Sequence, residues 1–511
     1  MARTGDQSDG TYLNPILCSD YSDPDPIAVG DDFYLTASSF NCMPGLPILH
    51  SRDLVNWTII GHALERLPMA CYDQPCHGRG VWAPAFRYHD GRFWIFFATP
   101  DEGIFMTTAP KPTGPWSALH CVQEASGWID PCPFWDGDGK AYLIHALAAS
   151  RTGLNSVLVL HRMAPDGSRL LDEGHVVIDG HFHHPVVEGP KLYKRNGYYY
   201  VFAPAGGVRG GWQSVFRAKS IDGPYEDRIV LCQGNTDING PHQGGWVQTS
   251  KGRCWFLHFQ DRGAYGRVLH LQPMKWEGDW PLIGQQAKAP KVYEPVLRCA
   301  KPDVGKNYPI VRPQASDDFS GSTLGLQWQW MANPNASWYS LSASPGKLRL
   351  FSQGTTSEWS NWWQAGNLLL QKPQDMHFRV TTHLTVEAAA SGDHAGLILT
   401  GGVGVALVVE RADDRWRLAL YIMEQANQTQ PQIAETLPWD SGVAHLRFEM
   451  EQGVGRFSAS KNARQFVSIG PAVHPGSAAW LGAKVGLFSL NPGTKPSSGY
   501  ADFSCFDYEA L

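Results

Sequence analysis

Three acidic residues stand in similar settings along the chain: Asp23 in YSDPDPI, Asp130 in WIDPCPF and Glu188 in VVEGP. Each is followed by proline, or by glycine and proline, which restrict the backbone and so fix the direction of the acidic side chain. Taken singly, an Asp-Pro pair is usually a turn, and a glutamate beside a Gly-Pro turn is usually a strand-end residue. Three such acids together suit acid–base chemistry, in which one carboxyl donates a proton and another activates water.

A short pattern that recurs five times predicts the elements that position these acids. In each copy a turn glycine precedes an aromatic residue in an apolar strand, and successive aromatic residues are 48 to 60 positions apart. These aromatic residues are Tyr34, Trp94, Tyr142, Tyr200 and Trp255. Five units of about fifty residues without helical periodicity predict a five-bladed β-propeller. A β-sandwich is less favoured, because chance would not keep these positions in phase through five copies.

The acids occupy equivalent places in this repeat. Asp23, Asp130 and Glu188 lie seven, nine and nine residues before the turn glycine of their units. Each therefore heads the innermost strand of a blade, and the innermost strands of different blades converge at the axis of a propeller. The sequence thus predicts that three acids far apart in the chain meet at one axial site.

The chain as a whole is expected to be all-β, with two domains. Residues 1–298 form the predicted propeller, residues 299–316 an irregular linker, and residues 317–511 a second domain. In that second domain, the stretches 378–386 and 444–450 alternate between apolar and polar side chains, as strands with one buried face do. About ten such candidate strands predict a jelly-roll or concanavalin-like β-sandwich. It would serve as a sugar-binding module, a lid or a stabilising partner.

Composition excludes several classes of function. A formal net charge of -6 and a pI near 6.3 leave no basic footprint for nucleic acid or for a membrane surface. The N-terminus lacks the apolar run of a signal peptide, so a cytoplasmic location is expected, and export of a longer precursor stays open. Ten scattered cysteines predict no zinc site. Motifs of serine hydrolases, zinc proteases, P-loop enzymes and dinucleotide-binding folds are missing from the sequence.

Read together, the motifs YSDPDPI, VWAP, WIDPCPF, VVEGP and GAYGRVLHLQPMKW resemble glycoside hydrolase family 43, specifically its β-xylosidase-like members with a C-terminal sandwich. The resemblance implies that Asp23 is the general base, that Asp130 orients and tunes the acid, and that Glu188 is the general acid of an inverting hydrolysis. It also implies that Arg267, in the last of these motifs, lies against the terminal sugar. No cofactor is required for this chemistry.

Further site residues follow from the same resemblance. His242 in GPHQGG corresponds to a histidine associated with a structural calcium, although a buried histidine bonded to a carbonyl is more common and calcium prefers oxygen ligands. Trp82 and Phe40 are candidates for stacking on a sugar face or for simple core packing. Trp128 and Ile129 replace a glycine-phenylalanine pair of many xylosidases of the family, and are expected at the wall of the sugar pocket.

The expected function is therefore an inverting exo-glycosidase that removes β-1,4-linked xylose from the non-reducing end of xylo-oligosaccharides. The alternatives are an α-L-arabinofuranosidase, a bifunctional enzyme, and a non-catalytic carbohydrate-binding propeller. The expected partner is an oligosaccharide, without nucleic acid or membrane. A homo-oligomer remains open.

Overall fold

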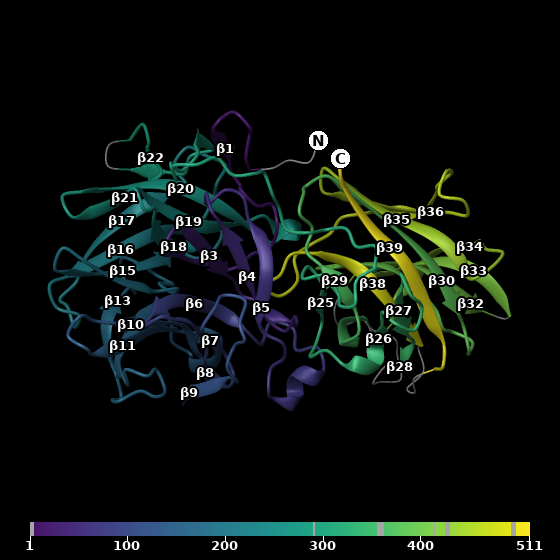
Figure 1. Cartoon of the computed structure of the whole chain (residues 1–511), viewed down its shortest axis with the longest axis horizontal. Helices are drawn as coiled ribbons and strands as arrows, with labels where there is room; N and C mark the ends of the chain where they lie inside the picture. Colours follow the sequence, from purple (N-terminus) through teal and green to yellow (C-terminus); the bar gives the residue numbers. More distant parts are fainter. Residues whose placement is uncertain (1–4, 290–291, 355–361, 413, 425–429, 492–496) are drawn as a thin grey trace.

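The computed structural model describes residues 5–511 except 290–291, 355–361, 413, 425–429 and 492–496. Two β-rich bodies lie side by side, the N-terminal one at the left of Figure 1 and the C-terminal one at the right. The first is a five-bladed β-propeller and the second a β-sandwich, which confirms the predicted all-β fold. No helix among the described residues is long and apolar enough to cross a membrane.

The propeller consists of five antiparallel sheets, each built from four strands that are consecutive in the chain. The blades are β2 (Asp25–Val29), β3 (Asp32–Thr36), β4 (Gly45–Ser51) and β5 (Thr58–Leu64); β6 (Trp82–His89), β7 (Arg92–Thr99), β8 (Gly103–Ala109) and β9 (His120–Glu124); β10 (Trp128–Trp135), β11 (Ala141–Leu147), β12 (Val157–Met163) and β13 (His175–Asp179); β14 (Lys191–Arg195), β15 (Tyr198–Ala205), β16 (Trp212–Ala218) and β17 (Glu226–Cys232); β18 (His242–Gln248), β19 (Cys254–Asp261), β20 (Arg267–Glu277) and β21 (Trp280–Ile283).

The sequence repeat corresponds to the second strand of each blade. Its five aromatic residues lie in β3, β7, β11, β15 and β19. The first strands of neighbouring blades contact one another, β2 with both β6 and β18, and β10 with both β6 and β14. These first strands therefore surround the axis, where the repeat predicts that the acids meet.

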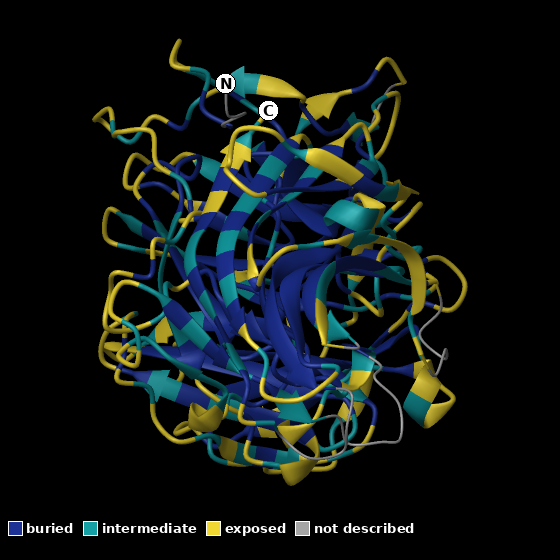
Figure 2. Ribbon diagram, turned by 90° about the vertical axis from the view of Figure 1, so that its right-hand side faces the viewer, coloured by how far each residue is buried: buried dark blue, intermediate teal, exposed yellow. Residues whose placement is uncertain are grey.

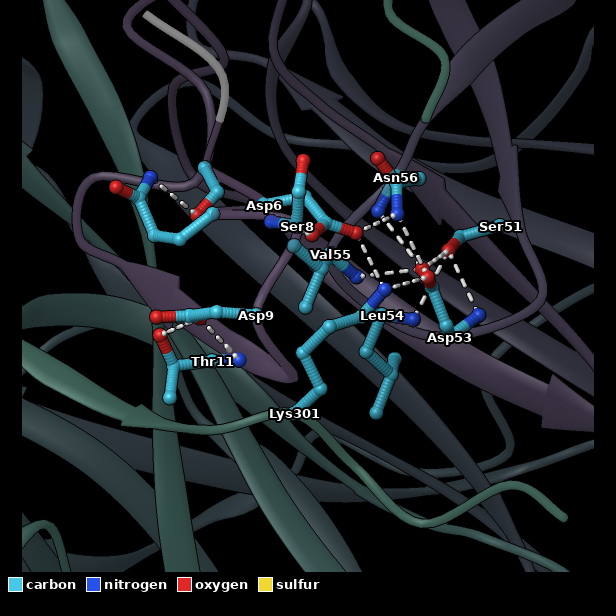
Figure 3. Close-up of polar contacts among 12 residues, drawn as sticks. Asp6, Ser8, Asp9, Thr11, Ser51, Asp53, Leu54, Val55, Asn56 and Lys301 are labelled. Atoms are coloured by element: carbon cyan, nitrogen blue, oxygen red, sulfur yellow. Dashed lines mark hydrogen bonds and ion pairs between the residues drawn. The ribbon is translucent and has the colours of Figure 1, made fainter. Parts of the chain in front are cut away.

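The two ends of the propeller are joined by polar contacts near the N-terminus (Figure 3). Strand β1 (Thr11–Leu13) pairs with β24 (Arg298–Ala300), which follows the last blade. Lys301 then forms ion pairs with Asp6 and, at 3.0 Å, with Asp53 of the first blade. The Asn56 amide donates to both carboxylates, at 2.8 and 2.7 Å. Buried ion pairs of this kind are favourable only when their polar atoms are satisfied, and Asn56 supplies hydrogen bonds to both carboxylates here. The cluster therefore connects the first blade with the segment that follows the last blade.

The second domain is a sandwich of two sheets. One sheet contains β25 (Gln329–Trp330), β29 (Leu369–Gln371), β38 (Lys484–Asn491), β31 (His394–Thr400), β32 (Gly404–Ala412), β33 (Arg415–Met423) and β34 (Gln432–Pro438), with β28 (Gln353–Gly354) paired to β38. The other contains β26 (Tyr339–Ser340), β27 (Leu348–Phe351), β39 (Tyr500–Ala510), β30 (Phe378–Glu387), β35 (Val443–Glu451), β36 (Val454–Ser460) and β37 (Val467–Val473). The predicted alternation in 378–386 and 444–450 is present in β30 and β35.

Short elements complete the described chain. They are β22 (Gln285–Gln286), β23 (Tyr293–Glu294), α1 (Ala149–Thr152) and the 3-10 turns η1 (Ala70–Asp73), η2 (Gly263–Tyr265), η3 (Ala336–Trp338) and η4 (Trp362–Gln364).

The sandwich packs against the propeller with the outer face of its β38–β31–β32–β33 sheet. Side chains of that face, among them Ile398 and Ala406, form one apolar cluster with Phe40 and Cys42 of the propeller. Figure 2 shows strands of the sandwich in dark blue or banded dark blue and teal, with exposed loops around them. Backbone bonds also join the domains, with Met43 and Trp330 paired in both directions. The two domains therefore share a packed interface that reaches Phe40.

Candidate active site

The three acids line one cavity at the axis of the propeller, with a volume of about 390 Å³. Asp23 lies just before β2, Asp130 lies inside β10, and Glu188 lies just before β14. The cavity wall is completed by Phe40, Trp82, Ala83, Ile129, Gln243, Arg267 and Trp480. The structure thus brings together carboxyl groups that are separated by 107 and 58 positions in the sequence.

The backbone around the cavity has register shifts in three blades and positive φ values at two of the acids. The pairing of β6, β10 and β18 with their second strands shifts register close to the cavity, at Trp82, Ile129 and His242 respectively. Such bulges redirect side chains. Asp23 and Asp130 both adopt positive φ, 54° and 57°, which is costly for residues with a Cβ and is typical of functional sites. The propeller therefore holds its acids in place through its packed blades.

Asp23 is held by donors alone. Its Oδ2 accepts hydrogen bonds from the hydroxyls of Ser22 and Ser38, at 2.8 and 2.6 Å. Nη1 of Arg267 lies 3.1 Å from its Oδ1, and the same nitrogen donates to Ser22 at 2.6 Å. These donors fix the direction in which the carboxylate faces the cavity. A carboxylate held in this way suits a general base.

Asp130 is the most buried of the three acids, with 3% of its surface exposed. Its Oδ2 accepts hydrogen bonds from the backbone N–H of Gly189, at 2.8 Å, and from the Gln243 amide, at 3.0 Å. Burial and the neighbouring carboxyls of Glu188 and Asp23 raise the pKa of Asp130 well above its usual range, against the opposing effect of its hydrogen bonds and of Lys191. Asp130 therefore keeps its proton at pH values where an isolated aspartic acid would release it.

Gly189 makes the link between Asp130 and the loop of Glu188 possible. Its φ is +59°, and a Cβ at this position would lie 2.5 Å from the Gln243 side chain. A glycine therefore allows the close approach through which its N–H reaches Asp130. The EGP sequence thus couples Asp130 to Glu188 through adjacent backbone.

Glu188 faces the cavity from a different environment. Its side chain is 27% exposed, and its Oε1 lies 2.8 Å from Nε2 of the buried His242. The flanking Val187 and Gly189 are buried, whereas Glu188 opens toward the cavity. An accessible carboxyl with one fixed partner suits proton donation to a bound ligand.

The aromatic wall includes two of the predicted stacking residues, Phe40 and Trp82, together with Ile129. Trp128 does not line this cavity. Its ring instead stacks on His145, with centroids 4.2 Å apart. Neighbouring residues of a strand point to opposite faces, so only Ile129 of this pair reaches the site, and the prediction that both form the sugar wall is corrected for Trp128.

The surroundings of His242 do not fit the expected calcium. Its Nε2 is engaged by Glu188, and its buried Nδ1 has no hydrogen-bond partner in the described part of the chain. Calcium takes six to eight oxygen ligands, whereas one imidazole nitrogen is all that the His242 side chain leaves open. Among the described residues, no three His, Cys, Asp or Glu side chains converge to hold a metal ion. In this structure His242 is a hydrogen-bond partner of Glu188.

Comparison with known proteins identifies the family. The profile of Glycosyl hydrolases family 43 matches residues 12–281, and that of the Beta xylosidase C-terminal Concanavalin A-like domain matches residues 316–509. The chain belongs to glycoside hydrolase family 43. It is therefore a glycoside hydrolase, which removes the non-catalytic propeller from the alternatives.

Relatives of this family 43 enzyme carry two kinds of name. A putative beta-xylosidase of Xylanibacter ruminicola is 44% identical over 78% of this chain and 74% of its own length. A non-reducing end alpha-L-arabinofuranosidase of Bacteroides ovatus is 31% identical over 84% of this chain and 78% of its own length. The crystal structure of xylan beta-1,4-xylosidase from Bacillus halodurans has a TM-score of 0.86 and 26% identity, covering 97% of this chain and 99% of that one.

Sequence reasoning missed several residues of the family 43 site, among them Ser38, Gln243 and Trp480. Ser38 donates to Asp23 and Gln243 donates to Asp130, and they lie close in sequence to the predicted site residues Phe40 and His242. Trp480 had no such signal. It comes from the sandwich, between β37 and β38, and its ring lies 5.8 Å from that of Trp82 and 5.7 Å from the Arg267 guanidinium carbon. The second domain thus supplies part of the cavity wall.

Proposed function

We propose that the protein is an inverting exo-glycosidase that removes β-1,4-linked xylose from the non-reducing end of xylo-oligosaccharides. The observation that carries this proposal is the pairing of two unlike carboxyls in one small cavity. Asp23 is fixed by Arg267 and two hydroxyls, whereas Glu188 is partly exposed beside His242. An acid and a base in different environments are what glycoside hydrolysis requires.

In this mechanism Asp23 accepts a proton from water as the water oxygen bonds to the anomeric carbon. The glycosidic C–O bond breaks, and Glu188 donates its proton to the leaving oxygen. The result is a free sugar with inverted anomeric configuration and a shortened chain. Asp23 then holds the proton taken from water and Glu188 is ionised, and proton exchange with solvent restores both groups.

The aromatic wall of the cavity supports exo action. Phe40, Trp82 and Trp480 restrict the space around the acids. A site restricted in this way suits one terminal sugar unit better than the middle of a long chain. Arg267 borders both Asp23 and the Trp480 ring, where it would contact the hydroxyls of that unit.

The second candidate is an α-L-arabinofuranosidase, alone or together with xylosidase activity. It is favoured by the relative of that name and by Ile129 at the cavity wall, where the family pattern of many xylosidases differs. The chemistry is the same, and only the shape of the sugar pocket separates the two candidates.

Parallel assays on 4-nitrophenyl β-D-xylopyranoside and 4-nitrophenyl α-L-arabinofuranoside test the substrate, and we expect the higher kcat/KM on the xyloside. A proton NMR time course on xylotriose tests the mechanism, with α-xylose expected as the first product. Higher kcat/KM on the arabinofuranoside would replace the xylose assignment. β-Xylose as the first product would overturn inversion.

A further inference from the structure

The sandwich carries a cavity of its own, away from the three acids, with a volume of about 570 Å³. It is lined by Trp362, His394, Glu410, Arg411, Arg417 and Tyr421, among others. Its residues come from β31, β32, β33 and the turn η4, so one sheet of the sandwich forms its floor.

The strand pattern puts this floor on the outer face of the sheet. Along β32, Leu407 and Val409 point into the sandwich core, while Ala406 and Val408 belong to the cluster that packs against the propeller. Glu410 follows in the same alternation. Its neighbours across the sheet are His394 of β31 and Arg417 of β33. The face is therefore apolar where it meets the propeller and becomes polar at this cavity.

The charges of the floor are balanced internally. Glu410 is 4% exposed, and its two oxygens accept hydrogen bonds from Nε of Arg417, at 2.6 Å, and from the Tyr421 hydroxyl, at 2.9 Å. Burial lowers the pKa of His394, so its ring is neutral at pH 7. Arg411, which also lines the cavity, pairs with Asp414 at 3.1 Å, so each arginine of the cavity has a carboxylate partner. The floor therefore suits a neutral ligand.

One polar group in this cavity lacks a partner within the described residues. Trp362 is only 2% exposed. Its indole Nε1 is buried and forms no hydrogen bond with the described residues. A buried N–H without an acceptor costs free energy. The Trp362 and Tyr421 rings stand perpendicular, with centroids 6.1 Å apart, and the His394 ring lies 6.2 Å from that of Tyr421. The wall thus combines an unsatisfied donor with aromatic faces.

We propose that this cavity is a second saccharide-binding site, which takes a neutral β-linked pentose chain. Sugar hydroxyls both donate and accept, so they can satisfy the Trp362 N–H and share the Glu410 carboxylate, while the apolar faces of the sugar rings pack on the aromatic side chains. The choice of a pentose chain as ligand rests on the proposed function. The site itself rests on the sandwich residues alone.

Contacts between the domains link the segment that carries Trp362 with Trp82 of the catalytic cavity. Trp363, next to Trp362 in η4, accepts a hydrogen bond at its carbonyl from His77, at 2.5 Å. Gly78, next to His77, accepts one from the Trp82 indole at 3.2 Å. A second site on the same protein raises the local concentration of a chain for the first site. It would therefore favour long substrates over short ones.

The test uses the full-length chain with Glu188→Gln, which prevents turnover, and isothermal titration calorimetry with xylohexaose. We expect two binding events per chain. Adding Trp362→Phe or Tyr421→Phe removes one hydrogen-bonding group from the cavity and should weaken one event about five- to tenfold. Tyr500→Phe, on β39 of the opposite sheet, is the matched control and should change neither event.

One binding event per chain, unaffected by Trp362→Phe and Tyr421→Phe, would overturn the second site. Thermal melts of each variant check that the loss of binding is not a loss of folding. Turnover of 4-nitrophenyl β-D-xylopyranoside by the chain with Glu188 intact is measured separately. Its absence would count against the proposed function, whereas the titration alone decides the second site.

Discussion

The cavity of the propeller and the cavity of the sandwich are lined by similar side chains, but they differ in the ratio of acidic to basic groups. Each has a carboxyl group, an arginine and a tryptophan in its wall. The propeller cavity sets three carboxyls against Arg267, whereas the sandwich cavity sets Glu410 against Arg411 and Arg417. The propeller cavity therefore has more acids than bases, whereas in the sandwich cavity Glu410 forms an ion pair with Arg417.

That difference determines which cavity can move protons. In the propeller, burial and like charges raise the pKa of Asp130, so this acid keeps its proton in a cavity that Glu188 and Asp23 also line. In the sandwich, Glu410 is held by Arg417 and Tyr421 and has no acidic partner among the described residues that line the cavity. The first arrangement suits catalysis and the second suits binding.

Removing the acid of the propeller cavity should have the largest effect. Glu188→Ala is expected to lower kcat on xylotriose by about 10²- to 10⁴-fold, because a general acid contributes that much to a reaction with a poor leaving group. Substrates with a dinitrophenyl leaving group need no proton and should lose far less. Glu451→Ala, an exposed glutamate of the sandwich, is the control. Equal losses on both substrates would contradict the acid role of Glu188.

The next effect separates the activity of Asp130 from its influence on stability. Asp130→Asn keeps the shape of the side chain but cannot ionise, and we expect about a 10²-fold loss of kcat/KM. The native pKa of Asp130 is raised, so above its unfolded value of 3.8 the folded protein holds a proton that the unfolded chain releases. Stability of the wild type therefore falls as pH rises from that value toward the native pKa.

The amide introduced by Asp130→Asn does not titrate, so the stability of the variant relative to the wild type should increase as pH rises. We expect its melting temperature to exceed that of the wild type by roughly 1–3 °C at pH 7, with little difference near pH 4. Differential scanning calorimetry across this range measures the gap. A gap that does not change with pH would show that Asp130 has no raised pKa in the folded protein.

The sequence was sufficient for the fold and for the three acids because both are encoded by repetition. A turn glycine and an aromatic residue mark the second strand of every blade, and Asp23, Asp130 and Glu188 keep phase with them. Motifs also identified Arg267, which contacts Asp23. Features that repeat, or that sit next to a repeat, can be located without coordinates.

Contacts across long sequence separations could not be predicted in this way. Trp480 reaches the catalytic cavity from the other domain, and no local pattern marks it. Gln243 bonds to Asp130 from the fifth blade only because a register shift turns it toward the axis. The prediction for Trp128 was wrong for a simpler reason. Adjacent residues of a strand face opposite sides, and the bulge in β10 affects which of them faces the cavity.

Trp480 tests how far the sandwich contributes to the catalytic cavity. Trp480→Ala removes apolar surface beside Trp82 and Arg267, and we expect KM on 4-nitrophenyl β-D-xylopyranoside to rise about tenfold, with kcat changed less than about twofold. Because the side chain is 49% exposed, the melting temperature should hardly change. Phe182→Ala, an exposed aromatic residue of the propeller, is the control. A fall in kcat with unchanged KM would instead make Trp480 part of the transition-state environment.

The smallest effect concerns the length of the substrate. Tyr421→Phe removes a hydroxyl that bonds Glu410 in the sandwich cavity, so it should weaken capture of a long chain while the propeller cavity keeps all its residues. We expect the ratio of kcat/KM for xylohexaose to kcat/KM for 4-nitrophenyl β-D-xylopyranoside to fall about two- to fivefold. Tyr500→Phe should leave this ratio unchanged. If the ratio were the same in Tyr421→Phe and wild type, the sandwich cavity would have no part in turnover of long chains, and the two cavities would act independently.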